Sequence, residues 1–76
     1  MSAKIPVRWS PAGDGYEAVV NGVECFVWRE RRAARWRAAV GRKIVTTTAG
    51  GLTCDSWRLL REAKAAAESA ALARPA

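Results

Sequence analysis

The chain has no histidine, only two cysteines in 76 residues, and no long apolar run. The lack of histidine excludes a histidine base and a histidine metal ligand. Cys25 and Cys54 can form one disulfide at most, and they do not supply the roughly four ligands of a zinc site. No stretch approaches the roughly 18 apolar residues of a transmembrane helix, and the opening residues, broken by Pro6, do not predict a signal segment. We therefore expect a reduced, cytoplasmic protein with both thiols in its core.

The sequence motifs of enzymes are missing as well. The seven carboxylates are scattered along the chain, and none falls in a spacing that indicates paired acid–base catalysis. Gly50-Gly51 lacks the lysine and the hydroxyl that complete a phosphate-binding loop. These absences predict a protein that is not an enzyme, with no catalytic residue, no cofactor and no bound metal.

Arginine is abundant, and its charge is concentrated in one segment. Residues 29–43 hold seven basic residues against Glu30 alone, whereas the rest of the chain has six basic and six acidic residues. The whole net charge of +6 therefore lies in this segment. Such a concentration predicts an anionic partner, either nucleic acid or an acidic protein surface. The alternative is that the charge only keeps the protein soluble.

The clearest local signal is the hairpin around Asn21-Gly22, the preferred pair for a tight turn between antiparallel strands. It predicts strands over residues 16–20 and 23–29. The turn also predicts three cross-strand pairs, whose side chains share one face of the sheet: Val20 with Val23, Ala18 with Cys25, and Tyr16 with Val27.

Three more segments read as strands by composition and alternation: residues 5–9, 35–40 and 43–48. Residues 10–15 read as a turn. A helix follows over residues 55–73, capped by Thr53 or Asp55 and ended by Pro75. Its apolar arc is mostly alanine, so we expect it to lie close to the sheet: Leu59, Leu60, Ala63, Ala66, Ala67 and Ala70.

Together these elements predict one α+β domain over residues 1–76. We expect an antiparallel β-meander of four to five strands packed on one C-terminal α-helix. A single helix covers only one face of such a sheet.

The uncovered face is the candidate site. Alternation along the strands puts Phe26 and Trp28 on the side away from the helix, together with Arg35 and Arg37. Arginine neutralises phosphate, and aromatic rings stack on unpaired bases. The candidate residues for binding nucleic acid or a partner are Phe26, Trp28, Arg29, Arg31, Arg32, Arg35, Arg37, Arg42 and Lys43.

Other interpretations of this face remain open. A surface rich in Trp and Arg is also typical of a protein-binding hot spot. A further alternative is that Phe26 and Trp28 are buried. The N-terminal strand, the twist of the sheet, or a second copy of the chain in a homodimer through the open face would then cover them. A β-bulge in the arginine-rich region would reverse the side-chain register that follows it.

Three segments carry a resemblance to a known class of proteins. Residues 36–41 (WRAAVG), the threonine-rich stretch after them, and residues 59–68 (LLREAKAAAE) resemble small accessory proteins of actinobacterial phages and prophages. The resemblance covers roughly residues 16–70. It implies a viral protein of the host cytoplasm, and several kinds of such proteins act by binding a host protein and altering growth.

The layout of strands followed by one helix is also similar to the AP2-like arm-binding domains of phage integrases. That resemblance implies a sheet that enters the major groove of DNA with the helix packed behind it. Arg29, Arg35, Arg37 and Lys43 would then be the sheet residues that face DNA. This chain differs in having strands before Tyr16 and no catalytic domain after the helix.

The sequence thus predicts a non-enzymatic binding module of phage type that binds nucleic acid through a basic, aromatic sheet face. The alternative is a phage-encoded modulator that binds a host protein through the same surface.

Overall fold

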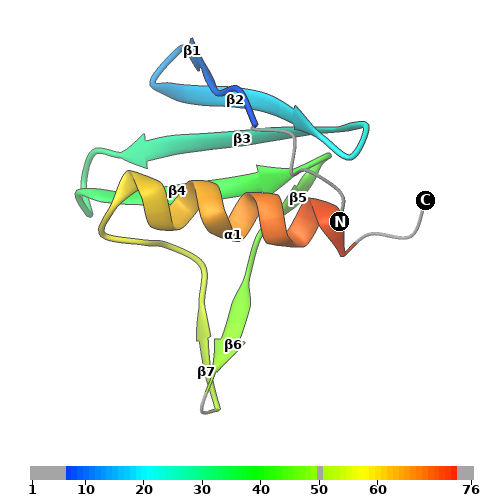
Figure 1. Cartoon of the computed structure of the whole chain (residues 1–76). Helices are drawn as coiled ribbons and strands as arrows, with labels where there is room; N and C mark the ends of the chain where they lie inside the picture. Colours follow the sequence, from blue (N-terminus) through cyan, green and yellow to red (C-terminus); the bar gives the residue numbers. More distant parts are fainter. Residues whose placement is uncertain (1–6, 50, 74–76) are drawn as a thin grey trace.

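An antiparallel five-stranded sheet with the order β1-β2-β3-β4-β5 forms the body of the protein. The computed structural model describes residues 7–49 and 51–73. The five strands of the sheet are β1 (Ser10–Ala12), β2 (Gly15–Val20), β3 (Val23–Glu30), β4 (Arg35–Val40) and β5 (Lys43–Ile44). A separate ribbon consists of β6 (Thr47–Ala49) and β7 (Leu52–Cys54), and one helix follows, α1 (Leu60–Leu72). The predicted α+β class and the antiparallel meander on one C-terminal helix are confirmed (Figure 1).

The β2–β3 hairpin forms as its turn residues predict. Asn21 and Gly22 have φ values of 54° and 74°, the left-handed pair that a type I′ turn requires. The three predicted cross-strand pairs are all present. Ala18, Val20, Cys25 and Val27 consequently point to the same side of the sheet, where they are buried.

The core lies between this inner face of the sheet and an alanine stripe on α1. Ala63, Ala67 and Ala71 recur every four residues, so they lie on one side of the helix, and all three have no exposed surface. Because these side chains are small, the helix lies close to the strands, and the bulk of the core comes from Val20, Val27 and other strand residues. Tyr16, Trp36 and other half-buried side chains pack around this core.

The first strand lies later in the chain than predicted. Val7, Arg8 and Trp9 are not in a strand, and Ser10–Ala12 pairs with β2 instead. Residues 5 and 6 of the predicted strand lie outside the described residues. The sheet accepts Pro11 because β1 is an edge strand, where a missing N–H costs little. Trp9 contacts the helix instead, and its Nε1 donates a hydrogen bond of 3.0 Å to a Glu68 carboxylate oxygen.

The prediction of one continuous strand over residues 43–48 is wrong. β5 ends at Ile44, and Thr47–Ala49 leaves the sheet to pair with Leu52–Cys54. The reason is that the rest of the β4 edge is occupied. Trp57 forms an isolated bridge with Trp36, with two N–H···O=C bonds of 2.7 Å between their backbones.

The same bridge explains why the helix begins later than residue 55. Residues 55–57 run beside β4, and α1 starts only at Leu60, with Leu59 as its N-cap residue. Thr53 lies in β7, so neither predicted cap is used. Glu62 instead accepts a hydrogen bond from the backbone N–H of Leu59 at 3.2 Å. The helix ends at Leu72, and Pro75 lies outside the described residues.

Among the described residues, no helix has the length and apolar character needed to cross a membrane.

The alanine stripe generates a prediction about stability. Ala67→Leu places a larger side chain where α1 has no exposed surface, so we expect it to lower the free energy of unfolding by about 1–3 kcal/mol. Ala65→Leu makes the same change on the exposed side of α1 and should leave stability almost unchanged. Urea denaturation followed by tryptophan fluorescence compares the two variants. Equal effects would contradict the close approach of helix and sheet.

Candidate binding surface

The nine candidate residues lie in three different places. Phe26, Trp28, Arg35 and Arg37 lie on the outer face of the sheet, which is the face away from α1. Arg29, Arg31 and Arg32 lie at the end of the sheet where β3 turns into β4. Arg42 and Lys43 lie at the turn between β4 and β5. The structure therefore does not bring the nine residues onto one surface.

The two ends are separated by the full length of β4. That strand has six residues, and at about 3.3 Å per residue it spans roughly 20 Å. Figure 1 shows the β3–β4 connection and the β4–β5 connection at opposite ends of the sheet. The segment that carries the whole net charge is thus continuous in sequence but divided in space.

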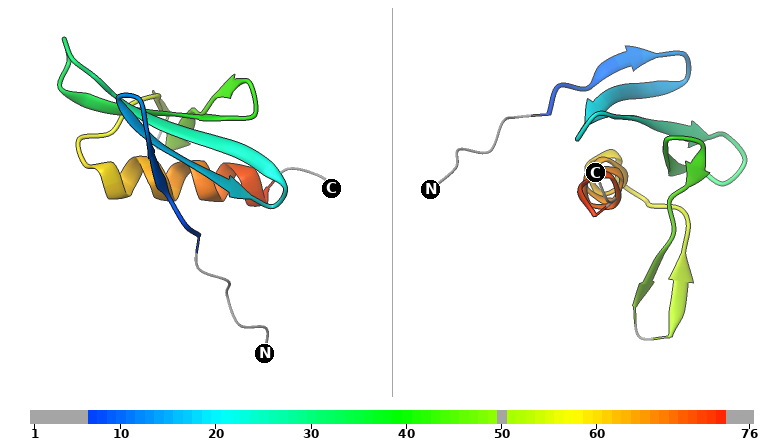
Figure 2. Two further views of the ribbon diagram at one scale, coloured as in Figure 1. Left: turned by 90° about the horizontal axis from the view of Figure 1, so that it is seen from above. Right: turned by 90° about the vertical axis from the view of Figure 1, so that its right-hand side faces the viewer.

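The outer face is open, because α1 packs against the inner face alone (Figure 2). Register places Phe26 opposite Ala39 and Trp28 opposite Arg37. Phe26 and Trp28 are half-buried. Their exposure is therefore intermediate between the two alternatives that the sequence left open, an exposed patch and full burial. Val19 and Ile44 add exposed apolar surface, with 67% and 46% of their area accessible.

The free charges of this outer face are two carboxylates and, at its margin, the guanidinium of Arg8. Glu17 lies opposite Phe26 and Glu24 lies opposite Val19, and both carboxylates are exposed. They line a shallow groove together with Arg8, Ser10, Ala18, Val19 and Phe26. Neither carboxylate forms an ion pair with a described residue. The alternation that places Phe26 on this face also places both glutamates there, so the sequence contained this signal.

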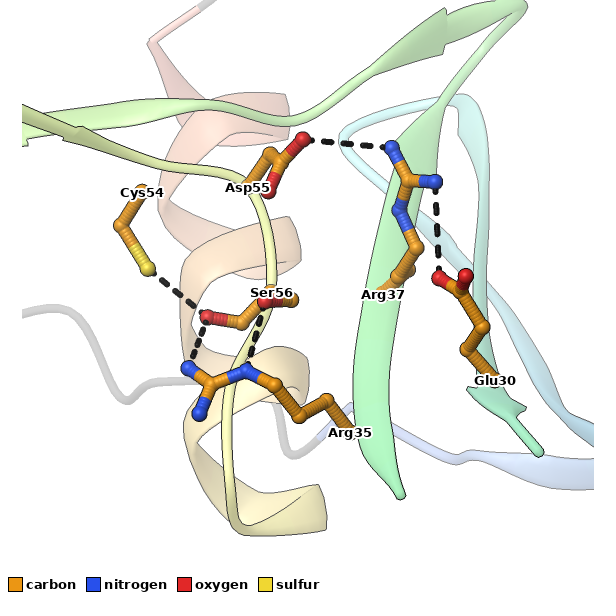
Figure 3. A network of polar contacts seen from close by, with 6 residues as sticks. All are labelled: Glu30, Arg35, Arg37, Cys54, Asp55 and Ser56. Atoms are coloured by element: carbon orange, nitrogen blue, oxygen red, sulfur yellow. Dashed lines mark hydrogen bonds and ion pairs between the residues drawn. The ribbon is translucent and has the colours of Figure 1, made fainter. Parts of the chain in front are cut away.

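Arg35 and Arg37 are engaged within the protein (Figure 3). The Nε of Arg35 donates to the Ser56 hydroxyl at 2.7 Å, and its Nη2 donates to the Ser56 carbonyl oxygen at 2.9 Å. Arg37 lies between two carboxylates, with 3.6 Å from Nη1 to Glu30 and 3.4 Å from Nη2 to Asp55. These contacts fasten the segment before α1 to β4, so both arginines have a structural role.

Arg37 is only partly satisfied by these contacts. Its side chain is 29% exposed, and its Nε is buried without a hydrogen-bond partner among the described residues. Because burying an unpaired donor costs free energy, the two carboxylates must offset that cost. The ion pairs of Arg37 therefore matter more than those of a freely solvated arginine.

A second group of arginines forms what we call the basic end. It lies at the end of the sheet that holds the β3–β4 connection, and α1 starts at this same end in Figure 1. The bridge between Trp36 and Trp57 brings the chain before the helix to this end. The basic end consists of Arg29, Arg31, Arg32, Arg58 and Arg61, all of them exposed.

The charge of the basic end is largely uncompensated. Arg31 lies 3.9 Å from Asp14, but both side chains are exposed by more than two thirds, and a pair of that kind contributes little. The other four arginines form no ion pair with a described residue. Sequence reasoning named three of the five. Arg58 and Arg61 were missed because they are distant in sequence and are brought here by the bridge at Trp57.

No group of three or more potential metal-binding side chains occurs among the residues that the structure describes.

Comparison with known proteins gives no relative. No protein-family model, no curated protein and no solved structure matches this chain. The resemblances to phage accessory proteins and to AP2-like domains therefore stay predictions.

The contacts of Arg37 predict a loss of stability when they are removed. We expect Arg37→Ala to lower the free energy of unfolding by about 1–2 kcal/mol, because two carboxylates lose their partner and residues 55–57 lose a fastening to β4. Arg32→Ala is the matched control, since it removes an exposed arginine without an ion pair and should leave the unfolding midpoint unchanged. Equal midpoints for the two variants in thermal denaturation would contradict a structural role of Arg37.

Proposed function

We propose that this protein is a non-enzymatic, cytoplasmic nucleic-acid-binding module that contacts the phosphate backbone through its basic end. The observation that carries the proposal is that five exposed arginines from two distant segments lie at one end of the sheet, and that Arg31 alone among them forms an ion pair with a described residue, the weak one with Asp14. Cations gathered in this way release counterions from nucleic acid, which is the main source of sequence-independent affinity.

The composition of the basic end favours backbone contact over base stacking. The tryptophans next to the basic end, Trp28, Trp36 and Trp57, are half-buried, and Trp36 and Trp57 pack against the core. No other aromatic residue belongs to the basic end. Arginines without adjacent exposed rings bind phosphates and do not provide the stacking platform typical of single-strand binding proteins. Little sequence preference is therefore expected.

The outer face gives less support to nucleic-acid binding than the sequence suggested. Of the four arginine and lysine residues named from the AP2-like layout, only Arg35 and Arg37 lie on that face, and both are bonded within the protein. Glu17 and Glu24 would repel phosphate there. We therefore expect nucleic acid to contact the end of the sheet and not its outer face.

The basic end predicts a steep salt dependence of binding. Five phosphate contacts to duplex DNA give a slope of log K against log salt of about −4 to −5, at about 0.9 per contact. Removing two cations with Arg29→Ala and Arg32→Ala should make the slope shallower by about 2. Fluorescence anisotropy with a labelled mixed-sequence duplex, measured between low and moderate salt, gives these slopes.

The matched control lies at the opposite end of the sheet. Arg42→Ala with Lys43→Ala removes the same charge from two exposed residues about one strand length away. This double variant should change the slope far less than Arg29→Ala with Arg32→Ala. Equal losses would show that net charge alone drives binding, and absence of wild-type binding at low salt would reject the proposal.

A protein partner is the second candidate, and the outer face favours it. Half-buried Phe26 and Trp28 share with exposed Val19 and Ile44 a sheet face that α1 does not cover. Free carboxylates at Glu17 and Glu24 suit a partner with basic residues. Aromatic surface with a polar rim is typical of protein-binding hot spots. A host protein bound here corresponds to the modulator that the sequence raised as an alternative.

The two candidates respond to different substitutions. Val19→Lys places a charge in the apolar part of the outer face and should abolish binding of a protein partner isolated from a nuclease-treated lysate. The same change should leave DNA affinity within about twofold, because Val19 lies outside the basic end. Isothermal titration with the purified partner measures the first effect. A partner whose affinity is unchanged by Val19→Lys but lost with Arg29→Ala and Arg32→Ala would contradict the outer-face interface.

A further inference from the structure

The β6–β7 ribbon projects from the body of the protein as an arm. It leaves the sheet after Val45, whose N–H donates to the Ala38 carbonyl at 2.9 Å, and the chain returns at Trp57. In both Figure 1 and Figure 2 the ribbon points away from the sheet and from α1. Every side chain that the structure describes between Thr46 and Thr53 is exposed. The arm is therefore surrounded by solvent.

The arm differs from the hairpin between β2 and β3, which is held down by the helix. There Val20 is buried, and the Asn21 Nδ2 donates to the Ala71 carbonyl at 3.2 Å. On the arm, a hydrogen bond of 3.3 Å joins the hydroxyls of Thr48 and Thr53, one from each strand. A lone two-stranded ribbon is marginally stable in water. Additional strands would stabilise it.

The two edges of the arm lack the sequence features that prevent an edge strand from pairing with a strand of another molecule. Proteins block such edges with lysine, proline, charged side chains or a bulge. Residues 44–54 contain neither proline nor any charged residue, and four of the eleven are threonine. Leu52, next to the tip, is 77% exposed. A β-prone, uncharged edge of this kind is suited to pairing with another strand.

Charge decides which partner fits the arm. Nucleic acid would find no cation on it to pair with phosphate, and a charged protein would find no opposite charge. The arm of a second copy presents the same neutral edge. Two bodies of net charge +6 repel each other, and projecting arms allow contact while the charged bodies stay apart.

We propose that the β6–β7 arm is a self-association site, through which two copies of this chain pair their arms about a twofold axis into one antiparallel sheet. The contact is isologous, so the same edge of each arm meets its own copy. The strands have three residues each, and the contact area is small. A weak, concentration-dependent dimer is expected. The inference does not depend on nucleic-acid binding.

Substitution at the centre of an arm strand tests the pairing. Thr48 in the middle of β6 and Thr53 in the middle of β7 are both exposed, so one of the two lies near the twofold axis whichever edge pairs. A lysine or a glutamate at that position brings like charges together, so either Thr48→Lys and Thr48→Glu or Thr53→Lys and Thr53→Glu should be monomers. An equal mixture of the two variants at that position should recover the dimer, because opposite charges then meet. Ser69→Lys is the control, since it adds the same charge on the exposed side of α1.

Sedimentation equilibrium gives the mass of each sample across a concentration series reaching about 1 mM, where weak contacts become populated. For the wild type and Ser69→Lys, the mass should rise from 8.2 kDa towards twice that value. Added salt should not weaken this association, in contrast to binding of DNA. A wild type that stays monomeric throughout, or a dimer that persists in the Lys and Glu variants of both Thr48 and Thr53, would overturn the proposal. The second result would move the interface elsewhere, such as the outer face.

Discussion

The backbone pairing of Trp36 with Trp57 is the constraint on which the rest of the architecture depends. Its two hydrogen bonds of 2.7 Å place the chain before α1 against the free edge of β4. That edge is then closed to a longer β5, so the intervening residues leave the sheet as the arm. The same pairing delays the helix until Leu60 and brings Arg58 and Arg61 to the end of the sheet that already holds Arg29, Arg31 and Arg32.

Side chains on both sides of this bridge reinforce it. Arg35 and Arg37 of β4 bond to Ser56 and Asp55, the two residues that precede Trp57. Arginines that look free in the sequence are therefore used to hold the chain in place. Most of the remaining positive charge lies on exposed residues that form no ion pair with a described residue, apart from the weak pair of Arg31 with Asp14. A binding site cannot be inferred from arginine content without knowing which arginines are already paired.

The sequence predicted the parts of the fold that local rules decide. Asn21-Gly22 fixed one turn and its register, alternation placed Cys25 and Val27 inside with Phe26 and Trp28 outside, and alanine spacing identified the helix face against the sheet. It did not predict the arm or the helix start. Both depend on a contact between residues 21 positions apart, for which Trp36 and Trp57 carry no distinguishing local pattern. The division of the predicted site has a different cause, the length of β4, because the two basic turns lie at the two ends of that strand.

The molecule presents three surfaces that differ in charge and polarity, a difference that the net charge of the whole chain does not reveal. The basic end is cationic and carries no exposed aromatic ring, the outer face is apolar with free carboxylates, and the arm is neutral. Salt would act on these surfaces in different ways: it would weaken the proposed phosphate contacts, screen the carboxylates of the outer face, and relieve the repulsion between two bodies in the proposed arm-to-arm dimer. A protein of 76 residues can thus present independent contacts, because each lies on a different element and none shares a charged residue with another.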